Sequence, residues 1–288
     1  MTTTFLTRLP RAEAEALAAS IEAPLEDLGV AHTLFEAGSD WEVTVYAEAD
    51  VVDEVATALA RLAPQIQFDR AELTDEDWVS MSLRALAPVR AGGFVVHGSH
   101  DRRAPRAGET AIEIDANRAF GTGHHGTTAG CLDAIDRVLK RGVRRRILDL
   151  GTGSGVLAIG IARRSRAPVL ATDIDPVAVA IAAENARRNG VGSLVRCVTA
   201  AGLDHRAIAR AAPFDLIVAN ILAGPLRRLA PAIGRVLSPG GTVVLSGLVE
   251  RQRASVLAAY RTQGIVHRQT LLREGWATLV LGREAKGI

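Results

Sequence analysis

The sequence predicts an α/β protein of two units, and three observations support this fold class. The chain has 288 residues, about the length of two ordinary domains. From residue 147 onward, short apolar runs alternate with helical segments, which is typical of a parallel sheet covered on both faces. Residues 1–77 hold 17 acidic residues against four arginines, a net charge of −13, whereas residues 78–288 hold 30 basic and 15 acidic residues, a net charge of +15. The two parts therefore differ in composition as well as in pattern.

Composition excludes several classes of protein. Apolar residues make up 48% and charged residues 23% of the chain, as in a folded globular protein. No apolar run approaches the roughly 20 residues that cross a bilayer, and the start, MTTTFLTRLP, has no secretory pattern. Cys131 and Cys197 form neither a disulfide framework nor a zinc-binding pattern. We expect a cytoplasmic monomer with no membrane partner.

The acidic part reads as strand, helix, strand, strand, helix, strand, which is the ferredoxin-like arrangement. Strands are expected at Thr2–Thr7, Ala31–Glu36, Trp41–Glu48 and Ile66–Phe68, and helices at Ala12–Ala23, ending at Pro24, and at Val51–Leu62. RNA-binding domains share this arrangement, but they stack bases on aromatic residues within a basic surface. Because this part is acidic and poor in aromatics, we expect no nucleic-acid readout.

A linker helix is expected between the two units. Thr74 can cap a helix that covers roughly Glu76–Leu86, with Asp77 three residues after the cap. The sequence therefore divides into an acidic unit at residues 1–70, a linker at 71–87 and a larger unit at 88–288.

The larger unit should contain five parallel strands, their helices and a final antiparallel hairpin. The strands are expected at Arg146–Leu150, Val169–Thr172, Leu194–Val198, Phe214–Ala219 and Thr242–Ser246. The helices are expected at Val156–Arg164, Pro176–Asn189, around 207–212, Pro225–Leu237 and Arg251–Thr262. Only three residues separate the last two strands, Ile265–Leu272 and Trp276–Leu281, which indicates a hairpin.

The strongest motif is DLGTGSG, Asp149 to Gly155, placed between a strand and a helix. Its glycines let the backbone turn sharply and approach a ligand closely. Asp173, at the end of the next strand, can accept hydrogen bonds from ribose hydroxyls. Together these features favour a cofactor that contains a nucleoside. The spacing GxGxG differs from the GxGxxG of most NAD-binding loops, and Asp175 is expected to cap the following helix.

A second motif is AFGTGHHGTT, Ala119 to Thr128, in which Thr127 and Thr128 lie near an expected helix start. The adjacent His124 and His125 suggest a metal site. However, neighbouring side chains point apart in an extended chain, and no carboxylate or cysteine stands at ligand spacing. We expect no metal here and a loop that closes over the cofactor.

The third motif is Asn220-Ile221-Leu222-Ala223, at the end of the fourth strand, where ligands of parallel sheets bind. It has neither a proline nor an aromatic residue, so a flipped base would find poor stacking. An aliphatic amine on a flexible side chain fits better. Alternatively, Asn220 only satisfies backbone groups at the strand end.

These motifs, in this order, resemble the PrmA family, the methyltransferases of large-subunit ribosomal protein L-eleven (L11). The resemblance rests on AFGTGHHGTT, DLGTGSG, TDIDPVAVAIAAENARRNGV and VANILAGPLRRLAP, and it covers about residues 119–248 well. It implies a Rossmann-like methyltransferase sheet and S-adenosylmethionine as the cofactor. It also implies that Thr128, Gly151, Asp173 and Asn220 contact that cofactor, and we expect Gly153 to line the same site. The familiar loop reads GTGTHPTT, so His124 and Gly126 depart from it.

The resemblance further implies that lysine and N-terminal amines of L-eleven become multiply methylated, and that the acidic unit recognises this basic ribosomal protein. Asn220 is the candidate for orienting either the substrate nitrogen or the methionine end of the cofactor, and no general base is evident. Two rival functions remain: a methyltransferase of the same fold acting on another protein lysine or a small amine, and a non-catalytic module that binds S-adenosylmethionine. The acidic surface has its own alternative role, which is solubility.

Overall fold

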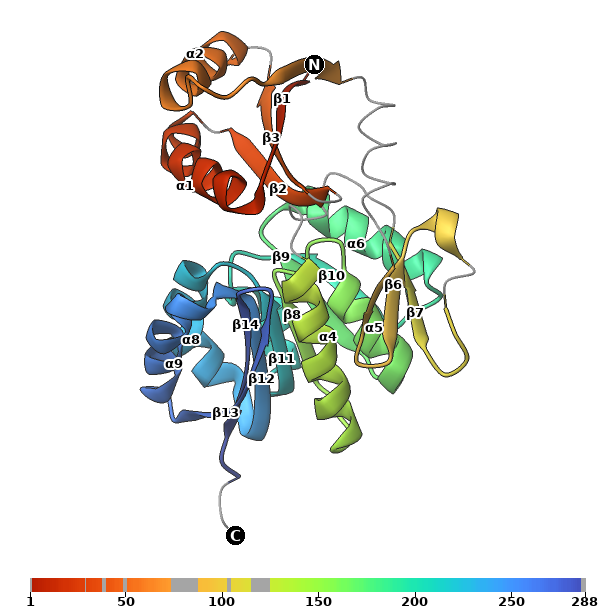
Figure 1. Ribbon diagram of the computed structural model, residues 1–288. Coiled ribbons are helices and arrows are strands. Elements are labelled where there is room, and N and C mark those ends of the chain that lie inside the picture. Colours follow the sequence, from red (N-terminus) through yellow and green to blue (C-terminus); the bar gives the residue numbers. More distant parts are fainter. Residues whose placement is uncertain are drawn as a thin grey trace. The chain divides into compact units, whose positions relative to one another are not determined.

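The structure is a computed structural model that describes residues 2–28, 30–37, 40–48, 51–73, 88–102, 105–114 and 125–285. The chain divides into two compact units, Met1–Arg84 and Ala85–Ile288 (Figure 1). The expected linker helix at Glu76–Leu86 lies outside the described residues. Within the described ranges, no helix is both long and apolar enough to cross a membrane.

The first unit has the expected order of elements. These are β1 (Thr2–Leu9), α1 (Arg11–Asp27), β2 (Ala31–Ala37), β3 (Asp40–Glu48), α2 (Val52–Leu62) and β4 (Asp69–Leu73). The strands form one antiparallel sheet in the order β2-β3-β1-β4. Alternate residues such as Val43 and Val45 turn to one face, where they pack with buried residues of α1 and α2 that include Ile21 and Leu59.

Two details of this unit differ from the prediction. Helix α1 continues through Pro24 to Asp27. A proline inside a helix costs about 3 kcal/mol, but the extra turn buries Leu25 completely, which is worth about 1.5–3 kcal/mol. The last strand is not Ile66–Phe68 but β4, whose residues pair with β1. Ile66 and Phe68 instead pack against the core from the preceding segment, because apolar burial does not require strand pairing.

The second unit is built on a seven-stranded sheet in the order β10-β9-β8-β11-β12-β14-β13. The strands are β8 (Ile147–Leu150), β9 (Val169–Asp173), β10 (Val195–Thr199), β11 (Phe214–Asn220), β12 (Leu237–Val249), β13 (Ile265–Arg273) and β14 (Trp276–Arg283). The first five pair in parallel, whereas β14 runs antiparallel to both β12 and β13. The predicted parallel sheet with an antiparallel C-terminal hairpin is confirmed.

Helices cover both faces of this sheet (Figure 1). They are α4 (His125–Lys140), α5 (Val156–Ser165), α6 (Pro176–Arg188), α7 (Arg206–Ala211), α8 (Ala223–Val236) and α9 (Arg253–Arg261), with short 3-10 turns at Ser99–Asp101 and Glu250–Gln252. Neighbouring strand residues face opposite cores. Ile147 packs with residues of α4, α5 and α6, whereas Leu148 packs with residues of α7, α8 and α9. Burial on both faces explains the continuous apolar runs of the sequence.

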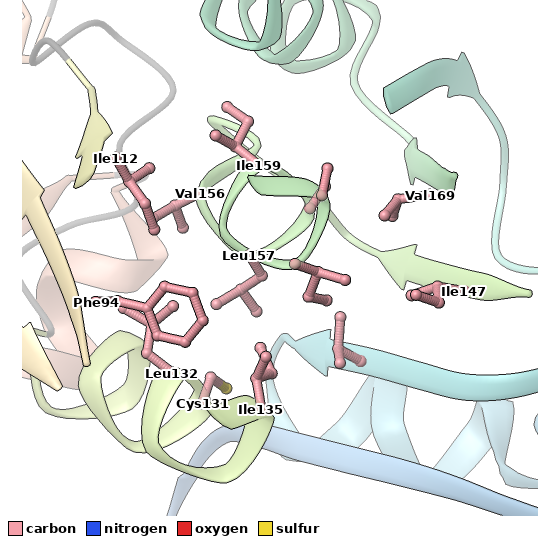
Figure 2. Packing of buried hydrophobic residues seen from close by; sticks show 14 of the residues in the cluster. Phe94, Ile112, Cys131, Leu132, Ile135, Ile147, Val156, Leu157, Ile159 and Val169 are labelled. Carbon is pink, nitrogen blue, oxygen red and sulfur yellow. The ribbon is translucent and has the colours of Figure 1, made fainter. Parts of the chain in front are cut away.

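A small third sheet, which the sequence pattern does not predict, packs on the α4–α5 side. It contains β5 (Val89–Ala91), β6 (Phe94–His97) and β7 (Thr110–Glu113), in the order β5-β6-β7. Figure 2 shows Phe94 and Ile112 turned into the same core as Leu132. This sheet thus covers helices whose other side faces the main sheet.

Candidate active site

A cavity of about 730 Å³ opens at the carboxyl ends of the parallel strands of the second unit. It lies where the ends of β8, β9 and β11 meet, the usual ligand-binding edge of a parallel sheet. All five site residues expected from the sequence line it: Thr128, Gly151, Gly153, Asp173 and Asn220. These residues come from α4, the loop after β8, β9 and β11, so only the fold brings them together.

The loop after β8 adopts a backbone conformation and a close packing that require glycine. Gly151, Gly153 and Gly155 have φ angles of +72°, +53° and +87°, in the left-handed region that favours glycine. A Cβ on Gly151 would lie 2.3 Å from Cγ2 of Ile221. The backbone N–H groups of Gly151 and Thr152 donate to the Thr172 carbonyl, at 2.8 and 2.9 Å, which ties the loop to β9.

Asp173 ends β9 and points its carboxylate at the glycine loop. Its Oδ2 accepts a hydrogen bond from the Gly153 N–H at 2.8 Å, and its Oδ1 accepts one from the Asp175 N–H at 3.1 Å. Each carboxylate oxygen has a further lone pair, so both can still accept from a ligand. Asp175 caps α6 by accepting from the Val177 N–H at 2.8 Å, as expected.

Asp149 lies beneath the loop and does not line the cavity. It is 1% exposed, and its Oδ2 accepts hydrogen bonds from the Thr152 hydroxyl at 2.7 Å and the Ala158 N–H at 3.0 Å. Its buried Oδ1 has no hydrogen-bond partner among the described residues. Burial, together with the charge of Asp173, raises the Asp149 pKa to about 6. Asp149 therefore joins the loop to the first turn of α5, while its charged form is disfavoured.

Asn220 ends β11 and reaches across to α4. Its Nδ2 donates to the Thr127 Oγ1 at 3.3 Å, so this hydrogen bond goes to a side chain rather than to strand-end backbone. The next residue, Ile221, donates its N–H to the Ser246 carbonyl at 3.2 Å. A Cβ on Gly247, whose φ is +83°, would lie 2.4 Å from the Ile221 carbonyl oxygen. The ends of β11 and β12 are therefore in close backbone contact beside the cavity.

The lining residues that were not predicted include Thr127, Gly247 and Trp276. Thr127 was recognised only as part of a threonine pair near a helix start. Gly247 and Trp276 belong to β12 and β14, and no local motif marks them as site residues. They reach the cavity because β14 pairs with the carboxyl half of β12, a tertiary arrangement.

The structure describes only residues 125–128 of the AFGTGHHGTT motif. Residues 119–124 lie outside the described residues, so the closing loop stays a prediction, as does any role of His124. Helix α4 begins at His125, which confirms the helix start expected near Thr127 and Thr128. Within the described ranges, no group of three or more His, Cys, Asp or Glu residues could hold a metal ion.

The fold and the cavity define a class of protein. A glycine loop after the central parallel strand, an acidic residue ending the next strand and an antiparallel hairpin completing the sheet characterise the Rossmann-like methyltransferases. The family model described as "Ribosomal protein L11 methyltransferase (PrmA)" matches residues 8–284. The chain belongs to the ribosomal protein L11 methyltransferase family.

Individual relatives agree with this assignment. A ribosomal protein L11 methyltransferase of Mesorhizobium japonicum is 53% identical over 275 residues, which cover 93% of this chain and 95% of the relative. One of Brucella suis is 52% identical over 274 residues, which cover 94% and 96%. A crystal structure of a ribosomal protein L11 methylase from Lactobacillus delbrueckii subsp. bulgaricus is 28% identical, with a TM-score of 0.61, and the match covers 69% of this chain and all of that one.

The cofactor of the family is S-adenosylmethionine, and the cavity fits it. Its volume lies within the range of small-molecule sites, about 300–1,000 Å³. The Asp173 carboxylate offers acceptors for hydroxyl groups, and the missing side chain of Gly151 lets the loop lie directly against Ile221 at the cavity wall. The chain is thus an S-adenosylmethionine-dependent methyltransferase whose residues can hold that cofactor.

Proposed function

We propose that this chain transfers methyl groups from S-adenosylmethionine to lysine and N-terminal amines of ribosomal protein L11, and that these amines become multiply methylated. One observation carries the proposal: the glycine loop, Asp173 and Asn220 line one cavity in a chain that matches the L11 methyltransferase family over residues 8–284.

The residues of the cavity have distinct proposed roles. Thr128, Gly151, Gly153, Asp173 and Asn220 bind the cofactor, and Asp173 accepts from the ribose hydroxyls. Asn220 also orients the reacting groups. The cavity lacks the Pro-Pro-Tyr sequence after the asparagine that would suit a planar base, and it offers Ile221, Leu222 and Trp276 instead. This apolar wall suits the aliphatic stem of a lysine.

The chemistry requires a neutral amine. Bound S-adenosylmethionine supplies a methyl group on a positively charged sulfur, and the S–C bond breaks as the new N–C bond forms, leaving a thioether and a methylated ammonium. A free lysine has a pKa near 10.4, so the amine must first release its proton to solvent. The apolar wall disfavours the ammonium form by desolvation, which lowers the amine pKa. The protein then contributes mainly alignment of the amine, and we assign no general base.

We further propose that residues 1–70 form the recognition domain for L11, that residues 71–87 join it to the catalytic domain, and that residues 88–288 carry the chemistry. Recognition by charge is supported by the net −13 of residues 1–77, since ribosomal proteins are basic. The same negative charge repels the phosphate backbone, so this proposal includes no recognition of nucleic acid by residues 1–70. The chain acts as a cytoplasmic monomer in this proposal.

The test is methylation of L11 itself. Purified chain, isotope-labelled S-adenosylmethionine and unmodified L11 should give labelled L11, with mass increases of 14 Da per methyl group resolved by peptide mass spectrometry. L11 from cells that lack this chain should be unmethylated. Label that enters other proteins or small amines but not L11 would favour the same-fold alternative. Cofactor binding without S-adenosylhomocysteine production would favour the non-catalytic module.

A further inference from the structure

We propose that Thr127 is a positioning residue that holds the Asn220 amide with its oxygen, Oδ1, toward the substrate amine. The inference rests on the proposed function, because it assigns the amine as the group that Oδ1 meets. Thr127 would act through Asn220 and not through the cofactor.

The contact between the two residues is specific. Asn220 Nδ2 donates to Thr127 Oγ1 at 3.3 Å, and both residues line the cavity. Oδ1 of Asn220 accepts no hydrogen bond from the described residues. One end of the amide is therefore held by α4, while its other end is available to a ligand.

Close packing fixes the place of Thr127. Its side chain belongs to the first turn of α4 and the residue is only 4% exposed. One turn later, a Cβ on Gly130 would lie 2.3 Å from the Thr278 Oγ1 on β14. A Cβ on Gly126 would lie 3.3 Å from Cδ1 of Trp276. Because α4 lies this close to β14, the hydroxyl cannot shift far from Asn220.

The orientation of the amide matters to an amine nucleophile. An amide has an acceptor end, Oδ1, and a donor end, Nδ2. If Oδ1 faces the amine, it accepts an amine N–H and leaves the nitrogen lone pair free to attack. If Nδ2 faces the amine, it donates to that lone pair and competes with the reaction. Holding Nδ2 on Thr127 selects the first arrangement.

This role makes the three methyl transfers unequal. The neutral primary amine of the unmodified substrate has two N–H bonds, its monomethylated form (a secondary amine) has one, and its dimethylated form (a tertiary amine) has none. An acceptor at Oδ1 can therefore align the first two substrates but not the third. Loss of the Thr127 contact should slow the first and second transfers and spare the third, whereas damage to the fold or to cofactor binding would slow all three.

The experiment uses the full chain with unmodified L11 and compares wild type, Thr127→Val and Thr127→Ser. Valine keeps the shape but removes the hydroxyl, and serine keeps the hydroxyl. Thr242→Val is the control for the threonine-to-valine change, because Thr242 is a half-buried threonine of β12 that does not line the cavity. Consecutive rates come from time courses of the unmethylated, mono-, di- and trimethylated L11 peptides.

We expect Thr127→Val to slow the first two transfers about tenfold and the third by less than twofold. Thr127→Ser and Thr242→Val should keep the wild-type ratio of rates. Calorimetric affinity for S-adenosylhomocysteine and the midpoint of thermal unfolding should stay close to wild type for all variants. If Thr127→Val proves unstable, Thr127→Ala is measured in the same way.

Three results would overturn the inference: unchanged rates in Thr127→Val, equal slowing of all three transfers, or a cofactor affinity that falls in parallel with the rates. The last result would place the Thr127–Asn220 pair in cofactor binding instead. Wild-type chain that leaves L11 unmethylated would refute the proposed function, so the two failures are distinguishable.

Discussion

At the scale of single residues, the Asp173 carboxylate has one structural role and one proposed binding role. It holds the Gly153 N–H of the loop, and it is proposed to accept from the cofactor ribose. Hydrogen bonds to a charged group are each worth about 1.5–3 kcal/mol. Asp173→Ala should therefore weaken cofactor affinity at least tenfold, as measured by calorimetry.

Asp175→Ala is the control for this change. It removes the α6 cap, which costs about 1 kcal/mol of stability, but Asp175 does not line the cavity. Its cofactor affinity should remain near wild type. A loss of less than threefold in Asp173→Ala would contradict the assignment of Asp173.

Asp149 should leave a signature in the pH dependence of stability. Its pKa is about 6 in the folded chain, above the ordinary 3.8. The folded state therefore holds the proton more tightly than the unfolded state, and this contribution to stability is lost as pH rises from about 4 through 6. Between pH 5 and 8 the loss is about 1 kcal/mol, from 1.36 kcal/mol per pKa unit.

Asp149→Asn removes this titration. The free energy of unfolding of the variant, relative to wild type, should rise by about 1 kcal/mol from pH 5 to pH 8. Chemical denaturation at the two pH values measures it, and the double difference cancels the other titrating groups. A relative stability that does not change with pH would show that Asp149 is ionised throughout this range.

At the scale of elements, the close backbone contact between the ends of β11 and β12 borders the cavity. Gly240 and Gly247 both lie on β12 with positive φ, at +73° and +83°. A Cβ on Gly240 meets nothing closer than 3.9 Å, whereas one on Gly247 would lie 2.4 Å from backbone of Ile221. Gly240→Ala should thus cost only backbone strain, about 1–2 kcal/mol.

Gly247→Ala should cost more, because the turn that follows Asn220 must move. We expect a lower unfolding midpoint than in Gly240→Ala and a weaker affinity for S-adenosylhomocysteine, which Gly240→Ala should retain. Thermal unfolding and calorimetry on the two variants provide the comparison. Equal behaviour of the pair would mean that the β11–β12 contact does not hold the site in place.

The elements also show which features a sequence can predict. The sequence predicted the strands from β8 to β14 to within a few residues, because strands buried on both faces appear as continuous apolar runs. Only β12 differs more, since it extends further at both ends. Asp173 and the glycine loop follow from local spacing. By contrast, Thr127 and Trp276 are site residues only through the pairing of elements distant in sequence. The strand at Ile66–Phe68 was wrong because apolar residues pack there without pairing, and the short β5, β6 and β7 gave no clear periodicity.

At the scale of the whole molecule, the charge is divided between the units. Exposed acidic residues of the first unit include Glu13, Glu22, Asp53 and Glu54. The second unit carries most of the arginines. The cavity-lining residues that the structure describes all belong to the second unit, so changes in the charge of the first unit can be tested without altering those residues.

If this acidic unit recruits a basic substrate, neutralising it should weaken substrate use and spare the cofactor. The full-length variant changes Glu13 and Glu22 to Gln, Asp53 to Asn and Glu54 to Gln, which makes the net charge of residues 1–77 less negative, −9 instead of −13. We expect kcat/KM for L11 to fall several-fold at low salt, because steering depends on the field of the whole unit. Glu250→Gln with Glu284→Gln, two exposed changes in the second unit, is the control.

Salt should reproduce the effect of the neutralised charges. Exposed charges are screened beyond about 8 Å at 0.15 M and about 3 Å at 1 M ionic strength. For the wild type, kcat/KM for L11 should therefore fall as salt rises, and the neutralised variant should respond less steeply. Deleting residues 1–77 should abolish L11 methylation while calorimetry still detects cofactor binding. An acidic surface that serves only solubility predicts the reverse: a shallow salt dependence, four neutral substitutions without kinetic effect, and a truncated chain that methylates L11 as well as the intact one.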